Sequence, residues 1–363
     1  MQTKIPCTLF RGGTSRGTYF LASDLPADTD LRDRILIAVM GSPDPKQVDG
    51  VGGAHPLTSK VAIIKKSERE GVDVDYLFVQ VFVDDARTST KQNCGNILAG
   101  VGPYAIEKGL VEAGDLETTV TVYMENTASI AKLRIQTPGK QVNYEGDAAI
   151  DGVPGTSAPI MIEFVGVAGS SCGALFPTGN LTDDIDGAKV TLIDNGMPVI
   201  VIDATSAGIT GYESISELEE NKTLKERIES IRLQAGPLMN LGDVADKTVP
   251  KIALVSPSKQ GYMINTRCFI PHRVHDAIGV FAAVSVATAA AAKGTTAYPL
   301  AKIPEGNPKL CVVEHPTGSF TVEVDIDESK EEMTFRHASV LRTARLLFDG
   351  DVYIPASIWD GNQ

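Results

Sequence analysis

The cysteine best placed for chemistry stands at the start of an expected helix. Cys94 lies in the stretch NCGN (93–96), directly before the apolar run ILAGVGPYAI. A thiol at a helix N-terminus ionises more easily, because the unpaired N–H groups there carry partial positive charge. Asn93 or Asn96 could cap the helix, and Gly95 would let a ligand approach closely. Cys94 is therefore either a site residue or an ordinary buried cysteine, and its spacing alone leaves both interpretations open.

A lysine at the entry to an expected buried strand is the second candidate. Lys60 closes the glycine-rich stretch DGVGGAHPLTSK (49–60) and is followed by the apolar run VAII. A lysine withdrawn from water favours its neutral form and can then act as a general base. The alternative is an exposed lysine at a strand end, which is the commoner situation. The glycines before Lys60 favour the first interpretation, because they allow a ligand to approach the backbone.

Two further segments offer groups that bind carboxylates. The loop RGGTSRG (11–17) contains two arginines and the hydroxyls of Thr14 and Ser15, and the segment TRCFIPHRVHD (266–276) contains Arg267 and His272. Guanidinium groups bind carboxylates through paired hydrogen bonds. The candidate substrate-binding residues are Thr14, Ser15, Arg16, Ser59, Asn93, Gly95, Asn96, Arg267 and His272.

The sequence predicts neither a metal ion nor a cofactor. His272 and His275 would lie three positions apart on a helix, but a third metal ligand does not occur near them in the sequence, so helix capping or anion binding is the better interpretation. The spacings G-K-[ST] and G-x-G-x-x-G of nucleotide-binding loops are absent from both glycine-rich segments. Hydrolase motifs such as G-x-S-x-G are also absent from the sequence.

The elements that must position these residues recur in the same order along the chain. Strand-like runs, one apolar helix and more strand-like runs occur before the turn-rich stretch FPTGNLTDDIDG (176–187) and again after it, with the second apolar helix expected from about His275. This repetition predicts an α/β fold of two similar domains, residues 1–182 and 183–340, each with a curved sheet around a central helix. The helix N-termini would then face a cleft suited to carboxylates.

Composition narrows the class of protein. The 363 residues carry a net charge of −13, which disfavours nucleic acid and anionic membranes as partners. The start MQTKIPCTLF lacks the pattern of a secretory signal, and the longest apolar run, from Ala277, is shorter than the roughly 20 residues that span a bilayer. The five cysteines form no C-x-x-C pair, so free thiols are expected. These features favour the cytoplasm.

Several motifs, taken in order, resemble one known family. RGGTSRG, DGVGGAHPLTSKVAII, NCGN, DGVPGTSAPI, IESIRLQAG and INTRCFIPHRVH are similar to those of the PrpF-like methylaconitate isomerases, and within that family to the 4-oxalomesaconate tautomerases or isomerases of aromatic acid catabolism. The resemblance covers nearly the whole chain. It implies the diaminopimelate-epimerase-like fold, with mainly antiparallel sheets, and a C-terminal segment near 340–363 that completes the first domain.

The resemblance also implies roles for the two candidate catalytic residues. In the family, the lysine equivalent to Lys60 is the base, and the cysteine equivalent to Cys94 lies in the same pocket. Epimerases of this fold use a cysteine at each central helix, whereas the second helix here has no matching cysteine. One base without a cysteine pair favours moving a double bond over inverting a stereocentre. The resemblance implies that the substrate is an unsaturated tricarboxylate, most nearly 4-oxalomesaconate.

Other assignments stay open on the sequence. A methylaconitate or aconitate isomerase would differ only in substrate, and an epimerase only in its second acid–base group. An accessory protein of an iron–sulfur dehydratase would be a binding protein without turnover. A homodimer is left open as well.

Overall fold

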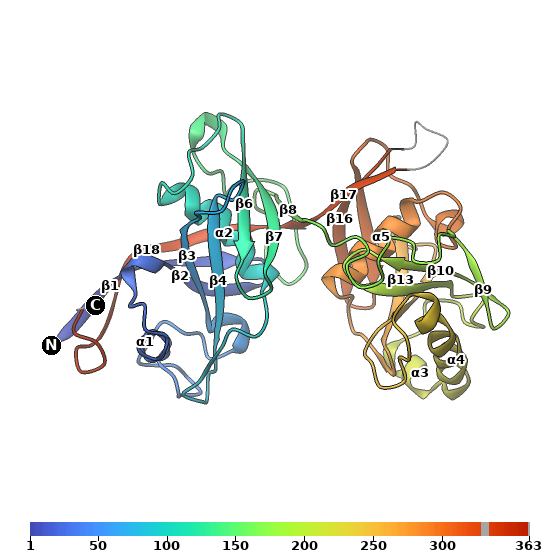
Figure 1. Cartoon of the computed structure of the whole chain (residues 1–363), viewed down its shortest axis with the longest axis horizontal. Helices are drawn as coiled ribbons and strands as arrows, with labels where there is room; N and C mark the ends of the chain where they lie inside the picture. The colour runs from blue at the N-terminus through green and yellow to red at the C-terminus, as the bar shows by residue number, and fades with distance from the viewer. Residues whose placement is uncertain (328–333, 362–363) are drawn as a thin grey trace. The chain divides into compact units, whose positions relative to one another are not determined.

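The computed structural model describes residues 1–327 and 334–361. Contacts divide the chain into two compact units, residues 1–165 with 342–363 and residues 166–341 (Figure 1). The domain boundaries predicted at 182 and 340 stay a prediction, and residues 362–363 of the predicted C-terminal segment lie outside the described residues. No helix among the described residues is long and apolar enough to cross a membrane.

The first unit is built on one mixed sheet. Neighbouring strands are antiparallel, except that β2 runs parallel to β3 and β4 runs parallel to β6. Along the sheet, the strands are β18 (Ala344–Pro355), β1 (Gln2–Gly12), β2 (Ser15–Leu21), β3 (Lys60–Lys66), β4 (Val74–Val81), β6 (Glu117–Met124), β7 (Ser129–Gln136) and β8 (Ile160–Phe164), with the short β5 (Thr88–Ser89) beside β4.

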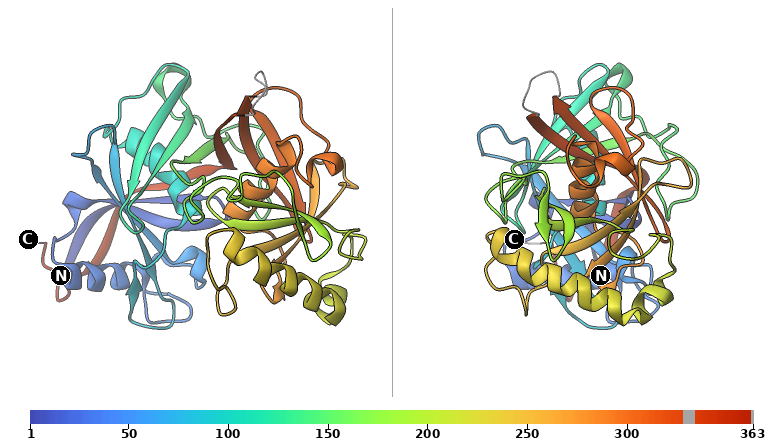
Figure 2. Two further views of the ribbon diagram at one scale, coloured as in Figure 1. Left: turned by 45° about the vertical axis from the view of Figure 1, so that its right-hand side comes forward. Right: turned by 90° about the vertical axis from the view of Figure 1, so that its right-hand side faces the viewer.

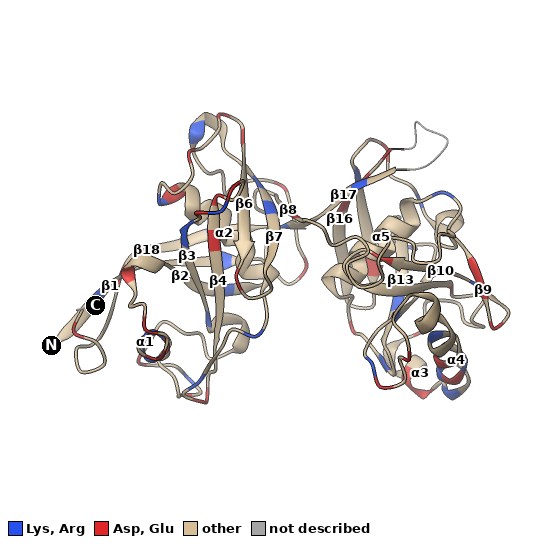
Figure 3. Cartoon of the chain, viewed as in Figure 1, with Lys and Arg blue, Asp and Glu red and all other residues tan. Residues whose placement is uncertain are grey.

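The helix α2 (Gly95–Glu107) lies at the centre of this unit, surrounded by the sheet. Every residue from Ile97 to Ala105 is buried, and the helix contacts β1, β2, β3, β4, β6, β7 and β18. A helix that is apolar all round can only be stable inside a protein, which explains why the sheet curves around it. Its only charged residue is Glu107, at its end. The rest of the helix is uncharged, and most of its ribbon is tan in Figure 3.

The helix α1 (Thr29–Met40) packs outside the sheet of the first unit. Asp28 caps it by accepting a hydrogen bond from the Leu31 amide (2.7 Å), and Gly41 ends it in the left-handed conformation (φ 76°). Its buried residues Ile35, Leu36, Val39 and Met40 form a core with the outer face of the sheet, including Ile5 and Phe20. The sheet is thus covered on both faces.

The second unit repeats this order of strands. Its pairs are antiparallel except β11 with β12 and β13 with β15, at the same two places in the order as in the first unit. The predicted repetition is therefore confirmed. The strands are β9 (Asp183–Ile185), β10 (Ala188–Asp194), β11 (Pro198–Asp203), β12 (Lys251–Ser256), β13 (Ile264–Ile270), β15 (Lys309–His315), β16 (Gly318–Asp327) and β17 (Thr334–Arg342), with the short β14 (Arg273–Val274) beside β13.

The central helix of the second unit is α5 (Val280–Ala291), and it begins later than predicted. The prediction that this helix begins at about His275 is wrong. Phe269 pairs with Val274 and Ile270 with Arg273, so residues 264–274 form a β-hairpin. The His275 amide donates a hydrogen bond to the Cys268 carbonyl (2.8 Å), which continues the hairpin. Residues 282–291 are all buried. The helices α3 (Ile215–Glu220) and α4 (Lys222–Leu238) cover the other face of this sheet (Figure 2).

Candidate active site

The structure brings Lys60 and Cys94 into contact. Lys60 is the first residue of β3 and Cys94 is the N-cap of α2. The Lys60 Nζ donates a hydrogen bond to Cys94 Sγ (3.3 Å), although 34 positions separate the two residues. Lys60 is 8% exposed and Cys94 9%, and the Lys60 Nζ lies 5.3 Å from the centre of the Phe78 ring. An amine and a thiol held together out of bulk water can exchange a proton with each other or with a bound molecule.

Ser59 belongs to the framework that holds Lys60 in place. Its hydroxyl accepts a hydrogen bond from Gln47 Nε2 (2.7 Å), and its carbonyl accepts one from Gln80 Nε2 (2.9 Å). Gln47 also accepts a hydrogen bond from the Ala54 amide (2.9 Å), so one buried amide side chain ties the middle of the glycine-rich loop to Ser59 near its end. The predicted substrate-binding role of Ser59 stays a prediction.

The hairpin between β1 and β2 packs directly against the first turn of α2. Asn96 Nδ2 donates a hydrogen bond to Thr14 Oγ1 (2.9 Å). A Cβ atom added to Gly12 would lie 2.3 Å from the Asn96 carbonyl oxygen, so only glycine fits at this position. Thr14 and Ser15, although distant in the sequence from Asn96, are therefore held in one local region with Asn96 and Cys94.

Several buried polar atoms in this region have no hydrogen-bond partner among the described residues. They include Ser15 Oγ, Arg16 Nε, Asn93 Oδ1 and Tyr76 Oη. Ser15 is only 2% exposed. Since burying a polar atom without a partner costs free energy, their concentration beside Lys60 and Cys94 is typical of a site that a polar ligand completes. A Cβ added to Gly95, in contrast, would make only an ordinary van der Waals contact, with Phe164 Cζ at 3.9 Å.

Sequence reasoning missed three charged or polar residues that surround Cys94. Burial raises the pKa of Tyr76 and of Tyr19 well above the ordinary tyrosine value, and the negative charge of an ionised Cys94 raises both further. Burial lowers the pKa of Arg342 to about 10, and the charge of Cys94 opposes that shift. The tyrosines lie in ordinary strand patterns and Arg342 lies almost 250 positions beyond Cys94, so no local signal could have found them.

Arg267 and His272 lie in the second unit, and the side chains of both interact with other residues of that unit. Arg267 Nε donates to the Glu213 carbonyl (2.8 Å) and its Nη1 donates to Asn265 Oδ1 (3.0 Å). His272 is exposed, and its Nδ1 lies 3.7 Å from Glu229 Oε2. Their predicted roles in carboxylate binding stay predictions. His272 and His275 do not share a helix, because the first lies in the turn between β13 and β14 and the second follows β14.

The second unit has its own lysine at the position equivalent to Lys60. Lys251 is the first residue of β12, and a Cβ added to Gly279, the N-cap of α5, would lie 3.8 Å from Lys251 Nζ. Burial lowers the pKa of Lys251, although a charge on the neighbouring Cys268 would raise it. Both units thus carry a lysine beside the start of the central helix, but the N-cap of that helix is a cysteine, Cys94, in the first unit and Gly279 in the second. Among the described residues, no group of three or more His, Cys, Asp or Glu side chains is arranged to hold a metal ion.

Known proteins of similar sequence match nearly the whole chain. The chain is 58% identical over 349 residues to the (4E)-oxalomesaconate Delta-isomerase of Novosphingobium sp. (strain KA1), covering 96% of this chain and 97% of that protein. It is 55% identical over 362 residues to the 4-oxalomesaconate tautomerase of Pseudomonas putida, covering 100% and 99% of the two chains.

A solved structure supports the same relationship. The crystal structure of methylitaconate-delta-isomerase is similar with a TM-score of 0.86 at 32% identity, covering 98% of this chain and 97% of that one. The predicted diaminopimelate-epimerase-like α/β fold is thereby confirmed. The model of the PrpF protein family matches residues 2–355. The chain therefore belongs to the PrpF protein family.

Proposed function

We propose that this protein is an isomerase that moves a proton, and with it a double bond, in an unsaturated tricarboxylate, most nearly 4-oxalomesaconate, without a cofactor. The observation that carries the proposal is the contact between Lys60 and Cys94 at the start of α2 (3.3 Å). The relatives with 55–58% identity over nearly the whole chain are named for 4-oxalomesaconate, which supports this substrate over methylitaconate or methylaconitate.

The proposed reaction needs one base. The neutral amine of Lys60 removes a proton from the carbon next to the conjugated system, and the electron pair of that C–H bond moves into the π system to give a dienolate. The protonated Lys60 then returns the proton to a different carbon of the same system. The substrate is isomerised, and the protein ends in the protonation state in which it began.

The start of α2 supplies the groups that stabilise the dienolate oxygen. The first amides of a helix have no partner within the helix, and here the first intrahelical bond is donated by Leu98 to the Cys94 carbonyl (2.9 Å). The amides of Cys94, Gly95 and Asn96 are thus available to a developing oxyanion, an arrangement typically worth about 3–4 kcal/mol per donor in a preorganised site. Gly95 has no side chain, and the nearest atom to an added Cβ would be Phe164 Cζ at 3.9 Å, so a ligand can approach these amides closely.

The carboxylates of the substrate require cations and hydroxyls around this centre. Ser15 and Arg16 each have a buried polar atom that lacks a partner among the described residues, which favours them as carboxylate ligands. Thr14 lies in the same loop as Ser15 and Arg16, and Asn93 directly precedes Cys94. Arg342 adds a half-buried cation that interacts electrostatically with Cys94. The roles of Arg267 and His272 in carboxylate binding stay predictions. We also propose a cytoplasmic location, and a homodimer stays a prediction.

Turnover of purified candidate substrates tests the proposal. We expect the pure protein to convert 4-oxalomesaconate with a kcat/KM at least about 100-fold above those for methylaconitate, methylitaconate and aconitate, because matching hydrogen-bonded groups discriminate by this factor or more. A preference for methylaconitate would replace the substrate. No turnover of any of the four by the folded protein would favour the accessory-protein alternative.

Replacing Cys94 by serine is expected to leave measurable activity. In the proposed mechanism the thiol positions Lys60 rather than carrying the proton. Serine places a hydroxyl, which also accepts a hydrogen bond, at the same position beside the amine. We expect kcat to fall by about 10-fold or less, against the 10²–10⁴-fold typical of losing an acid or base. Complete loss of turnover in a variant with wild-type circular dichroism would make Cys94 a proton-transfer group.

A further inference from the structure

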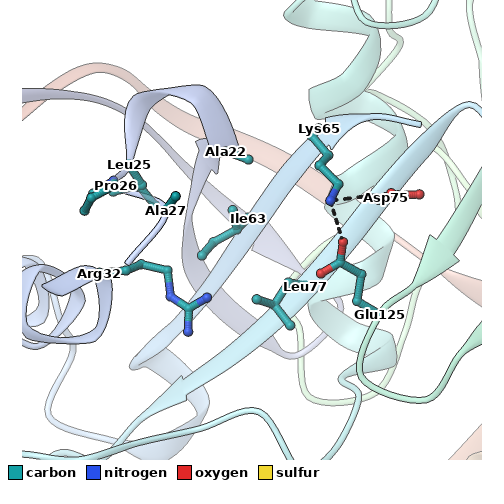
Figure 4. Close-up of a pocket in the computed structure, with 10 residues that line it drawn as sticks. All are labelled: Ala22, Leu25, Pro26, Ala27, Arg32, Ile63, Lys65, Asp75, Leu77 and Glu125. Carbon is teal, nitrogen blue, oxygen red and sulfur yellow. Dashed lines mark ion pairs between the residues drawn. The ribbon is translucent and has the colours of Figure 1, made fainter. Parts of the chain in front are cut away.

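The first unit contains two pockets outside the Lys60 region, and they differ in how their charges are paired. The pocket beside α1, of about 360 Å³, contains Lys65 paired with Asp75 (3.7 Å) and Glu125 (3.0 Å), so its charges largely neutralise one another (Figure 4). The other pocket, of about 490 Å³, is lined by Arg11 and Arg345. Neither of these arginines forms an ion pair with a carboxylate in the part of the chain that the structure describes.

The two arginines are direct neighbours across two strands. Arg11 on β1 and Arg345 on β18 are register partners in an antiparallel pair. Like charges directly opposite one another destabilise a sheet. Burial lowers the pKa of Arg11, and the charge of Arg345 lowers it further. A bound anion would remove this repulsion.

Arg11 is held in a fixed orientation at the wall of the pocket. Its Nη1 donates to the Thr343 carbonyl (3.1 Å) and to Thr343 Oγ1 (2.9 Å), and its Nη2 donates to Ser157 Oγ (3.1 Å). Arg345 is exposed and donates no hydrogen bond to any residue within 1–327 or 334–361, so its guanidinium can turn toward a ligand. Arg345 can bind a carboxylate through paired hydrogen bonds, whereas Arg11, whose Nη1 and Nη2 already donate within the protein, adds a fixed positive charge and its remaining N–H groups.

The remaining lining of the pocket includes apolar side chains and one acidic side chain. Val153, Pro154 and Leu346 supply apolar surface, and Glu145 supplies the single carboxylate among the lining residues. We propose that this pocket is a second ligand site, separate from Lys60 and Cys94, which binds a small organic carboxylate with an apolar body. Arg11 and Arg345 bind the carboxylate, and the body packs on the apolar wall.

Isothermal titration of the full chain with benzoate tests the proposal. We expect saturable binding by the wild-type protein, about 10-fold weaker binding by Arg345→Gln, and tighter binding by Glu145→Gln, because the first change removes an attractive charge and the second a repulsive one. Arg87→Gln, which removes an exposed arginine of the same unit that is paired with Asp85, is the matched control and should bind as the wild type does. All three variants should retain wild-type kcat/KM.

Three results would overturn the proposal. Wild-type protein that gives no saturable heat with benzoate would remove the site. Identical benzoate affinity in the wild type, Arg345→Gln and Glu145→Gln would place the ligand elsewhere, since benzoate bound beside Lys60 should respond to neither change. Arg345-dependent binding of inorganic phosphate without binding of benzoate would show a site for inorganic anions only, in which the apolar wall has no role.

Discussion

Turnover of the Lys60→Met variant is expected to fall by about 10²–10⁴-fold, the usual effect of removing a general base. Methionine keeps an apolar stem of similar length against Phe78 but has no lone pair that accepts a proton at this position. Because Lys60 is almost fully buried, removing its amine should not unfold the protein. The variant should also lose exchange of substrate protons with deuterium, measured by proton NMR in heavy water.

Lys66→Met is the control for this experiment. Lys66 is the last residue of the same strand, β3, but it is exposed, and its Nζ donates a hydrogen bond to the Leu110 carbonyl (3.0 Å). Its replacement should leave turnover and exchange close to wild-type values. If Lys60→Met retained exchange at the wild-type rate, another group would be removing the proton, and Lys60 would have to be reassigned to binding.

Gly12→Ala is expected to reduce both stability and activity. The added methyl group would lie 2.3 Å from the Asn96 carbonyl oxygen and 3.2 Å from Tyr19 Oη, so the β1–β2 hairpin must move away from α2. Overpacking of this kind typically costs about 1–3 kcal/mol. Activity should fall as well, because Thr14 and Ser15 move with the hairpin. Urea denaturation gives the free energy of unfolding, and kcat/KM gives the effect on the site.

Gly95→Ala separates the two effects. The nearest atom to its added Cβ is Phe164 Cζ at 3.9 Å, so the folded protein accommodates the methyl group, and alanine is better than glycine in a helix by up to about 1 kcal/mol. This variant should be as stable as the wild type or more so, yet turn over substrate more slowly, because the methyl group occupies the space next to the first amides of α2. Wild-type kcat/KM in Gly95→Ala would mean that substrate does not approach α2 there.

Much of the fold follows from patterns in the sequence. The runs VAII and TVTVYM lie in strands, and the two apolar runs that begin near Cys94 and Ala277 contain the buried central helices, because a continuous apolar run can be satisfied only inside a sheet that surrounds it. The predicted start of the second helix was wrong because four of the five residues 272–276 are polar, which is compatible with a helix start. The pairing of β13 with β14 decides their conformation, and no pattern in the sequence indicates that pairing.

The candidate site is less visible in the sequence than the fold. The residue types in NCGN and HPLTSK indicated an amine and a thiol, but their contact depends on β3 and α2 lying side by side in the folded unit. Tyr76 and Arg342 have no distinguishing neighbours in the sequence, and only the fold brings them to Cys94. Lys251 could be found only once β12 was seen to correspond to β3.

The pairing of β18 with β1 has a consequence for synthesis on the ribosome. The first and last strands pair from Gln2 to Gly12, and Thr8 donates a hydrogen bond to Asp349, 341 positions later. Until the ribosome has released residues 344–355, β1 has an open edge that can pair with other chains. The second unit is continuous in sequence, so it can fold while the first still awaits its final strand. Truncation after residue 341 should therefore spare the second unit and leave nascent chains prone to aggregate through β1.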